Sequence, residues 1–296
     1  MVTICCVGDL VVDVVVDLDR DPQRGTDTPV SIVHRRGGSA ANVAAATVIA
    51  GGVGRFVGQV GTDPAGSMLT AQMEQLGVEL TVTRHGTTGT IVVLVDASGE
   101  RSFLSDRGAA VHLSYAPNTV LDGVDVLHVP AYSLMTGPLA DTTQSLIGDA
   151  VQRAIPVSVS ASSVSSLADY GREQFLDLLK AVQPYVLLAN RDEARFLLEG
   201  HPWFPHASAT VVTNGPGEAR YSKPDGTDVR VAPEPVDALD TTGAGDAFAA
   251  GFLVSYLRDH DPEAALRNGH SLARGSLLNP GAAITDAINL ESETAQ

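Results

Sequence analysis

The chain has 296 residues, and 44% of them are hydrophobic, which is enough for a large buried core and too much for a mainly disordered protein. It carries 19 lysines and arginines against 35 aspartates and glutamates, and the net charge of −16 at pH 7 repels phosphate backbones and anionic lipids, so we expect a small-molecule substrate and no nucleic-acid or membrane partner. The apolar runs are shorter than the roughly 20 residues of a membrane-spanning helix, and no signal peptide precedes Asp9, which predicts a cytoplasmic protein.

The N-terminal part of the chain alternates strands with two helices and ends in a hairpin. Residues 2–7 form an apolar run that is typical of a buried strand. The adjacent Cys5 and Cys6 then point to opposite faces, so they cannot form a disulfide together, and we expect two buried thiols. The elements that follow are strands at 11–16 and 30–34, a small-residue helix at 40–50, a strand at 53–60, a helix within 61–77 and a hairpin of 91–95 with 101–104.

From residue 124 onward, strands and helices alternate regularly. The strands are predicted at 124–129, 157–159, 185–188 and 209–213, and the helices at about 138–154, 172–182, 191–198, 245–260 and 263–278. This rhythm predicts an α/β protein with a mostly parallel sheet covered by helices on both faces. Two β-rich stretches, about 11–36 and 84–107, do not fit the rhythm and are predicted to form a small sheet outside the main body. Residues 286–296 are expected to be a frayed tail.

The segment 240–248 carries the sharpest chemical signal. Small residues from Gly243 to Gly245 precede an apolar helix, where backbone N–H groups can approach a ligand closely and the helix dipole favours negative charge. Asp246 falls in the first turn of that helix and could serve there as a cap or dipole partner. An acid beside an anion cradle weakens anion binding, however, and is better explained as a general base that takes the proton of an attacking hydroxyl.

A second glycine-rich patch lies at 37–42. Its sequence, Gly-Gly-Ser-Ala-Ala-Asn, could hold a polyhydroxylated ligand by close backbone approach together with the Asn42 amide. Arg107 is a candidate for a further substrate contact, although a salt-bridged surface arginine explains it equally well.

A series of elements along the chain resembles those of the ribokinase family, the PfkB-type carbohydrate and nucleoside kinases. The resemblance covers nearly the whole chain. It is carried by Gly8 with Asp13, by 37–42, by the signature-like segments 58–66 and 240–248, by the lid-strand segments 88–90 and 99–101, by the Asn-x-x-Glu element 190–193, and by the nucleotide-loop segment 213–215.

The resemblance implies a three-layer α/β/α sandwich with a mostly parallel central sheet. The fold would be a single domain over 1–296, with a small β-sheet lid made of the segments 11–36 and 84–107. The implied reaction is ATP-dependent phosphorylation of a primary hydroxyl on a small sugar or sugar-like substrate, with magnesium as cofactor. Because lid strands of this family often pair between subunits, and exposed sheet edges seek partners, we expect a homodimer formed through the lid.

The resemblance also assigns roles to individual residues. The base is Asp246, and the anion hole is made by the amides of Gly243, Ala244 and Gly245. The substrate would be held by Asp13, Gly37, Gly38 and Asn42, with Arg107 as the further contact noted above. The nucleotide would be bound by Asn190, Thr213, Gly215, Gly243 and Gly245. Magnesium would be held through water by Asn190 and Glu193, and a potassium ion by Asp240 and Thr242.

The sequence departs from the family pattern at several positions, among them the glycine that usually follows Gly215, which is displaced to Gly217. Ribokinases proper have asparagine where this chain has Val11 and lysine where it has Ser39, and 158–162 lacks the Asp-x-Asn of many members. Two alternatives therefore stay open: a nucleoside kinase of the adenosine-kinase type, and a non-catalytic sugar sensor on the same fold. A retained base at Asp246 argues against the sensor. A dinucleotide-binding oxidoreductase is excluded by its glycine spacing, and a P-loop by the absence of any Gly-Lys pair.

Overall fold

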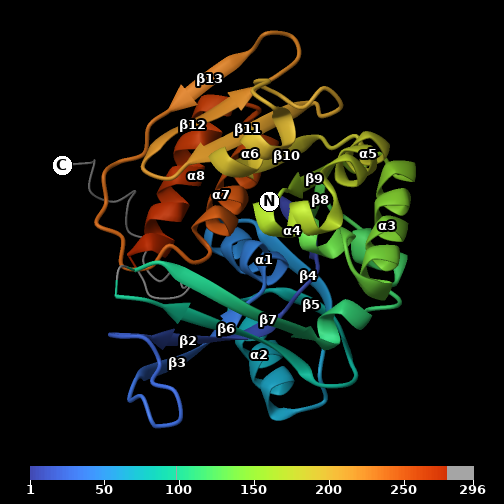
Figure 1. Cartoon of the computed structure of the whole chain (residues 1–296). Coiled ribbons are helices and arrows are strands. Elements are labelled where there is room, and N and C mark those ends of the chain that lie inside the picture. Colours follow the sequence, from blue (N-terminus) through green and yellow to red (C-terminus); the bar gives the residue numbers. More distant parts are fainter. Residues whose placement is uncertain (98, 279–296) are drawn as a thin grey trace, which may run out of the picture.

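The computed structural model describes residues 1–97 and 99–278, and its centre is a nine-stranded sheet (Figure 1). The strand order is β13-β12-β11-β10-β9-β8-β1-β4-β5. Neighbouring strands from β5 to β11 are parallel, and β12 and β13 are antiparallel to their neighbours. The bounds are β1 Thr3–Val7, β4 Val53–Val60, β5 Glu79–Arg84, β8 Val126–Pro130, β9 Val157–Ser160, β10 Val186–Asn190, β11 Ala209–Asn214, β12 Gly217–Ser222 and β13 Asp228–Val231.

Helices cover both faces of this sheet, and a hydrophobic cluster lies between the strands and each helical layer. Cys6 packs in the cluster that contains residues of α1, α2, α7 and α8, whereas Cys5 packs in the one that contains residues of α3 to α6. The two thiols are buried on opposite faces, as the strand pattern predicts. The helices are α1 Ser39–Ile49, α2 Pro64–Gln75, α3 Gly137–Gln152, α4 Val164–Tyr170, α5 Arg172–Val182, α6 Arg191–Leu198, α7 Ala244–Asp259 and α8 Pro262–Leu277. Short 3₁₀ turns η1 Ala109–His112, η2 Asn118–Leu121 and η3 Ala131–Leu134 connect some of the elements.

A separate sheet of four strands lies beside the main sheet, in the order β3-β2-β6-β7 (Figure 1). Its strands are β2 Val11–Asp17, β3 Ser31–Gly37, β6 Thr88–Val95 and β7 Arg101–Gly108. β2 pairs in parallel with β6, and the outer strands β3 and β7 are antiparallel to their neighbours. The predicted small sheet is thus confirmed, with strands that fall close to the two β-rich stretches. We call these four strands the small sheet below.

The predicted α/β class, with a mostly parallel sheet between two helical layers, is confirmed. The sequence pattern did not identify β5, β12 and β13, which complete the two edges of the main sheet, nor the short helix α4. β12 and β13 are antiparallel and partly exposed, so charged residues interrupt the apolar run that marks a buried parallel strand. The expected frayed tail at 286–296 lies outside the described residues. Within those residues, no helix is long and apolar enough to cross a lipid bilayer.

The topology gathers several loops at one edge of the main sheet. The parallel strands β1, β9, β10 and β11 all end there, because their carboxyl ends point the same way. α1 and α7 pack against each other, and the buried part of α1 is largely alanine, which lets two helices approach closely. Their N-termini therefore lie side by side at the same edge, which brings the two glycine-rich patches together.

Candidate active site

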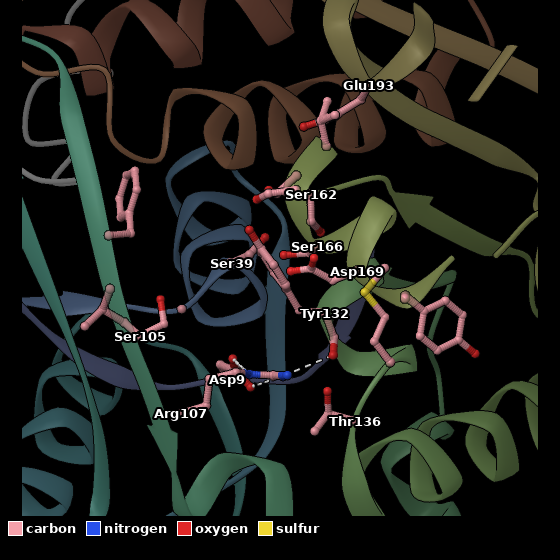
Figure 2. A pocket seen from close by; sticks show the side chains of 18 of the residues that line it. Asp9, Ser39, Ser105, Arg107, Tyr132, Thr136, Ser162, Ser166, Asp169 and Glu193 are labelled. Carbon is pink, nitrogen blue, oxygen red and sulfur yellow. Dashed lines mark hydrogen bonds and ion pairs between the residues drawn. The ribbon is translucent and has the colours of Figure 1, made fainter. Parts of the chain in front are cut away.

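Two adjoining cavities open at this edge of the sheet. One, of about 980 Å³, is lined by Asp9 and Arg107 and is called the Asp9 cavity. The other, of about 610 Å³, is lined by the start of α7 and is called the Asp246 cavity. The residues that line both are Ser39, Phe103, Tyr132, Ser162, Asn190 and Glu193. Figure 2 shows the Asp9 cavity with Glu193 toward one end, Asp9 and Arg107 at the other, and Ser39 between them.

Asp246 is the third residue of α7, and its carboxylate is held by two donors from α1. The Ser39 hydroxyl donates to Oδ1 at 2.6 Å, and the Asn42 amide donates to Oδ2 at 3.0 Å. The other end of the Asn42 amide accepts from Arg36 Nη1 at 2.7 Å. Burial raises the pKa of the Asp246 carboxyl, while these two hydrogen bonds and the charge of Arg36 lower it. The structure therefore fixes this carboxylate on the cavity wall and favours a stronger base than an exposed aspartate.

Gly243, Ala244 and Gly245 form the turn into α7. Gly243 is the N-cap residue with φ of 74°, a conformation that few residues other than glycine adopt. The first N–H groups of a helix have no acceptor within the helix, so they can bind an anion, although the N–H of Ala244 here also makes a long hydrogen bond of 3.4 Å to the carbonyl of Thr241. A Cβ built on Gly245 would meet no protein atom within 4 Å, so that residue faces open space in the Asp246 cavity. This is the geometry of a preformed anion cradle.

Gly37 and Gly38 let α1 begin close to the end of β1. A Cβ on Gly38 would overlap the carbonyl oxygen of Asp9, and its φ is 102°. A Cβ on Gly37 would overlap the carboxylate of Asp13, which packs on this glycine. Burial raises the pKa of Asp13 to about 6, against the opposing effect of Arg36. Asp13 lies near Asp246 but does not line either cavity, whereas Gly38 lines the Asp9 cavity.

Asp9 and Arg107 form a bidentate ion pair at one end of the Asp9 cavity (Figure 2). Arg107 Nε lies 2.7 Å from Asp9 Oδ2 and Nη2 lies 2.9 Å from Oδ1. Nη2 also donates to the backbone carbonyl of Tyr132 at 3.1 Å, and the guanidinium carbon lies 5.9 Å from the centre of the Tyr132 ring. Arg107 thus lines the cavity and is salt-bridged at the same time, so its role as a substrate contact stays a prediction, and its partner Asp9, shortly after β1, was not singled out from the sequence.

Asn190 and Glu193 form a complete capping box at the start of α6. The Asn190 side chain accepts from the N–H groups of Asp192 and Glu193, and the Glu193 carboxylate accepts from the backbone and the amide of Asn190, at 2.7–2.9 Å. Burial raises the pKa of Glu193, and the negative charge of Asp246 adds to the effect. Both residues line both cavities, so a carboxylate with spare lone pairs is presented to them.

The two nucleotide-loop residues are separated by the structure. Thr213, near the end of β11, lines the Asp246 cavity. Gly215, with φ of 52°, lies in the turn between β11 and β12 and does not line either cavity.

The groups predicted to hold potassium already bind guanidinium groups. Arg101 Nη2 lies 2.6 Å from Asp240 Oδ1, and its Nη1 donates to the hydroxyls of Thr241 and Thr242 at 2.9 and 2.8 Å. Arg35 Nη1 lies 2.6 Å from Asp240 Oδ2. A monovalent cation would compete for the same oxygens, so Asp240 and Thr242 as arranged here do not fit a potassium site.

Sequence reasoning missed several residues that surround Asp246. Ser39 was noted only as a departure from a family lysine, yet it donates to the carboxylate of Asp246. Arg36 supports Asn42 from the end of β3. A usable signal existed for Asp9, because a charged residue two positions after a buried parallel strand falls at the edge where such sheets bind ligands. Arg101 belongs to the lid-strand segment 99–101, but no local pattern connects it with its side-chain partners, which are 139 to 141 residues away.

Comparison with known proteins agrees with this geometry. Residues 1–288 match the pfkB family of carbohydrate kinases. The chain belongs to the PfkB carbohydrate kinase family. This kinase is 32% identical over 280 residues to an ATP-dependent ribose-1-phosphate kinase of Halopiger xanaduensis, covering 90% of this chain and 88% of that protein. The predicted resemblance and the predicted class, an ATP-dependent carbohydrate kinase, are confirmed.

Solved structures share the fold of the kinase over nearly its full length. The crystal structure of adenosine kinase from Sinorhizobium meliloti has a TM-score of 0.85 at 22% identity, covering 97% of each chain. A putative ribokinase II from E. coli, in complex with ATP and Mg²⁺, has a TM-score of 0.81 at 17% identity, covering 95% of this chain and 94% of that one. At these identities the likeness concerns the fold.

Proposed function

We propose that this kinase transfers the terminal phosphoryl group of ATP to a primary hydroxyl of a small sugar or sugar-like substrate, with Asp246 as the general base. One observation carries the proposal. The Asp246 carboxylate, fixed by Ser39 and Asn42, lines the same cavity as the open N-terminus of α7. A proton acceptor beside an anion cradle is the arrangement that phosphoryl transfer to an alcohol requires.

In this proposal each of the two cavities binds one of the two reactants. The sugar occupies the Asp9 cavity and the phosphates of ATP occupy the Asp246 cavity, so that the acceptor hydroxyl meets the terminal phosphate near Ser39. The hydroxyl oxygen forms a bond to phosphorus while the bond to the bridging oxygen of ADP breaks, and the hydroxyl proton passes to Asp246. The N–H groups of Gly243 to Gly245 stabilise the charge on the transferring group. Holding both reactants in line supplies a large part of the rate.

Magnesium fits the donor set at the shared wall of the cavities. The Glu193 carboxylate offers oxygen atoms of the kind that magnesium prefers, because the capping box leaves further lone pairs on both of them, whereas the Asn190 oxygen already accepts two backbone N–H groups. When bound with the nucleotide, the metal ion neutralises phosphate charge. In this proposal Asn190 and Glu193 orient it through water molecules, and Thr213 lies along the nucleotide.

The charged side chains that line the Asp9 cavity favour a sugar substrate that carries no phosphate. Arg107 is the single cationic side chain among the described lining residues, and both its carboxylate partner and the Tyr132 carbonyl already engage it. Asp169 and Asp192 add negative charge to the wall. A phosphate on the substrate would meet carboxylates and no free cation, so we propose that the sugar is not phosphorylated before it binds. The carboxylate of Asp9 suits a neighbouring pair of hydroxyls.

A nucleoside acceptor is the second candidate. The Asp9 cavity includes Phe103, Tyr132, Met135 and Tyr170, which offer an apolar and aromatic wall to a base. Its volume of about 980 Å³ is at the upper end of the range of ordinary ligand pockets.

The experiment is a screen for ADP release with free pentoses, free hexoses, ribose 1-phosphate and adenosine, in which Asp246→Asn gives the background. We expect release with at least one free sugar and identification of its primary phosphate ester by ³¹P NMR. Release with ribose 1-phosphate alone would overturn the proposed charge preference, and release with adenosine alone would establish the second candidate. Ligand binding without any release would favour a sensor.

A further inference from the structure

The turn before the anion cradle is held by two arginines of the small sheet. Arg101 is the first residue of β7, and Arg35 lies on β3. These are the two outer strands of the small sheet, yet both guanidinium groups converge on the single carboxylate of Asp240, each at 2.6 Å. Oδ1 of Asp240 also accepts the backbone N–H of Thr242 at 2.7 Å. One carboxylate therefore joins both edges of the small sheet to the segment that leads into α7.

Arg101 places a positive charge next to the turn where phosphate charge would develop. The cluster holds two guanidinium groups and one carboxylate, and a second carboxylate, that of Asp13, lies near Arg35 and Asp240. The Asp240 side chain is 9% exposed and the arginines 18% and 19%, so water screens this charge less than it would on an open surface. Arg101 also lines the Asp246 cavity, together with Gly243 and Gly245.

A monovalent metal ion and the Arg101 guanidinium would bind the same oxygens. The carboxylate of Asp240 and the hydroxyl of Thr242 are oxygen ligands for an alkali cation, but here they accept hydrogen bonds from Arg101. The guanidinium group is part of β7, so its presence at the turn, unlike that of a dissolved ion, does not depend on the salt concentration. It is present at the turn only when the small sheet is docked on the main body.

We propose that Arg101, supported by Arg35, supplies the fixed positive charge of the phosphate-binding turn in place of a monovalent metal ion, so that the kinase needs no potassium. Arg101 acts as a positioning residue, because it orders the turn through Thr241 and Thr242. The same contacts couple docking of the small sheet to assembly of the cradle. This inference rests on the proposed kinase function for its activity readout, and a second readout is independent of activity.

The activity experiment compares potassium chloride with tetramethylammonium chloride at equal ionic strength. We expect the wild-type enzyme to turn over at the same rate in both salts. Arg101→Ala should lose about 10- to 100-fold in turnover, below or at the scale of one lost donor to a developing anion, and potassium or added guanidinium ion should restore part of that loss. Arg101→Lys should retain more activity than Arg101→Ala. Arg84→Ala is the matched control, since Arg84 is an exposed arginine bonded only to Ser67 among the described residues.

Thermal unfolding in the two salts supplies the readout that does not depend on turnover. Wild-type protein should unfold at the same temperature in both, whereas Arg101→Ala should be stabilised by potassium, which can then reach Asp240. A wild-type enzyme that is inactive or less stable without potassium would overturn the inference, as would an Arg101→Ala variant with wild-type turnover. If no sugar supports ADP release in either salt, the proposed function fails, while the unfolding data still decide whether potassium binds.

Discussion

Replacing Gly245 by alanine should separate folding from catalysis. A Cβ at this position meets no protein atom within 4 Å, and the residue lies in the first turn of α7 with ordinary helical backbone. Alanine is favoured over glycine in helices by about 0.5–1 kcal/mol, so the variant should be at least as stable as the wild type, with a melting temperature on the order of 1 to 3 °C higher. The new methyl group, however, enters the space where a phosphate would approach the backbone. We expect turnover to fall about 100-fold, the scale of one lost anion-hole contact.

The assay is steady-state ADP release beside thermal unfolding of the same preparation. Gly148→Ala is the matched control, because Gly148 is an exposed glycine of α3 whose Cβ would also meet no atom within 4 Å. That variant should gain similar stability and keep full activity. If Gly245→Ala is as active as Gly148→Ala, the turn before Asp246 does not contact the transferring group and the anion cradle is refuted.

Three further predictions follow from the site. Burial raises the pKa of Asp246 and the hydrogen bond from Ser39 lowers it, so kcat/KM should fall as the pH drops through this pKa. Ser39→Ala should move this acidic limb of the pH profile to higher pH. A shift to lower pH would be incompatible with Asp246 as the base. Asp9→Asn should release Arg107 and raise KM for a free sugar about tenfold, as expected for one lost hydrogen bond to a charged group. It should also improve the relative activity on ribose 1-phosphate. Unchanged KM values for both substrates would refute the proposal that Asp9 binds the sugar. Ile32, which is 53% exposed on the outer strand β3, should lie in the proposed homodimer interface, so Ile32→Lys should convert a dimer to a monomer in sedimentation velocity, whereas a wild-type monomer would contradict the interface.

Most of the main sheet was predictable because its parallel strands are buried on both faces. Runs such as 2–7 and 53–60 are nearly continuous stretches of apolar and small residues for that reason, and their strands match the structure closely. β12 and β13 escaped detection because each is antiparallel and half-exposed, with arginine and acidic residues in the run. The hydrophobic pattern along the chain reflects burial, so it identifies a strand well only where the whole strand is buried to the same degree.

The candidate site could be predicted from the sequence where one short segment supplies both the glycine-containing turn and the reactive side chain. Residues 243–246 are such a segment, since the glycines and the carboxylate follow each other directly. Contacts between residues that are far apart in the sequence produce no such local pattern. Ser39 meets Asp246 because α1 packs on α7, and Arg101 reaches Asp240 because the small sheet docks there, over separations of 207 and 139 residues. For the same reason, Asn42 was expected to face substrate, whereas in the structure its amide joins Arg36 to Asp246.

Turnover and nucleotide affinity of Asp246→Asn together give the most direct test of the mechanism. The substitution keeps the shape of the side chain and removes the group that accepts the proton. ADP affinity, measured by calorimetry, should stay close to the wild-type value, while kcat with the best sugar from the screen should fall at least about 100-fold, the usual scale for a lost general base. A variant that binds nucleotide normally and also retains near-wild-type kcat would show that Asp246 is not the base.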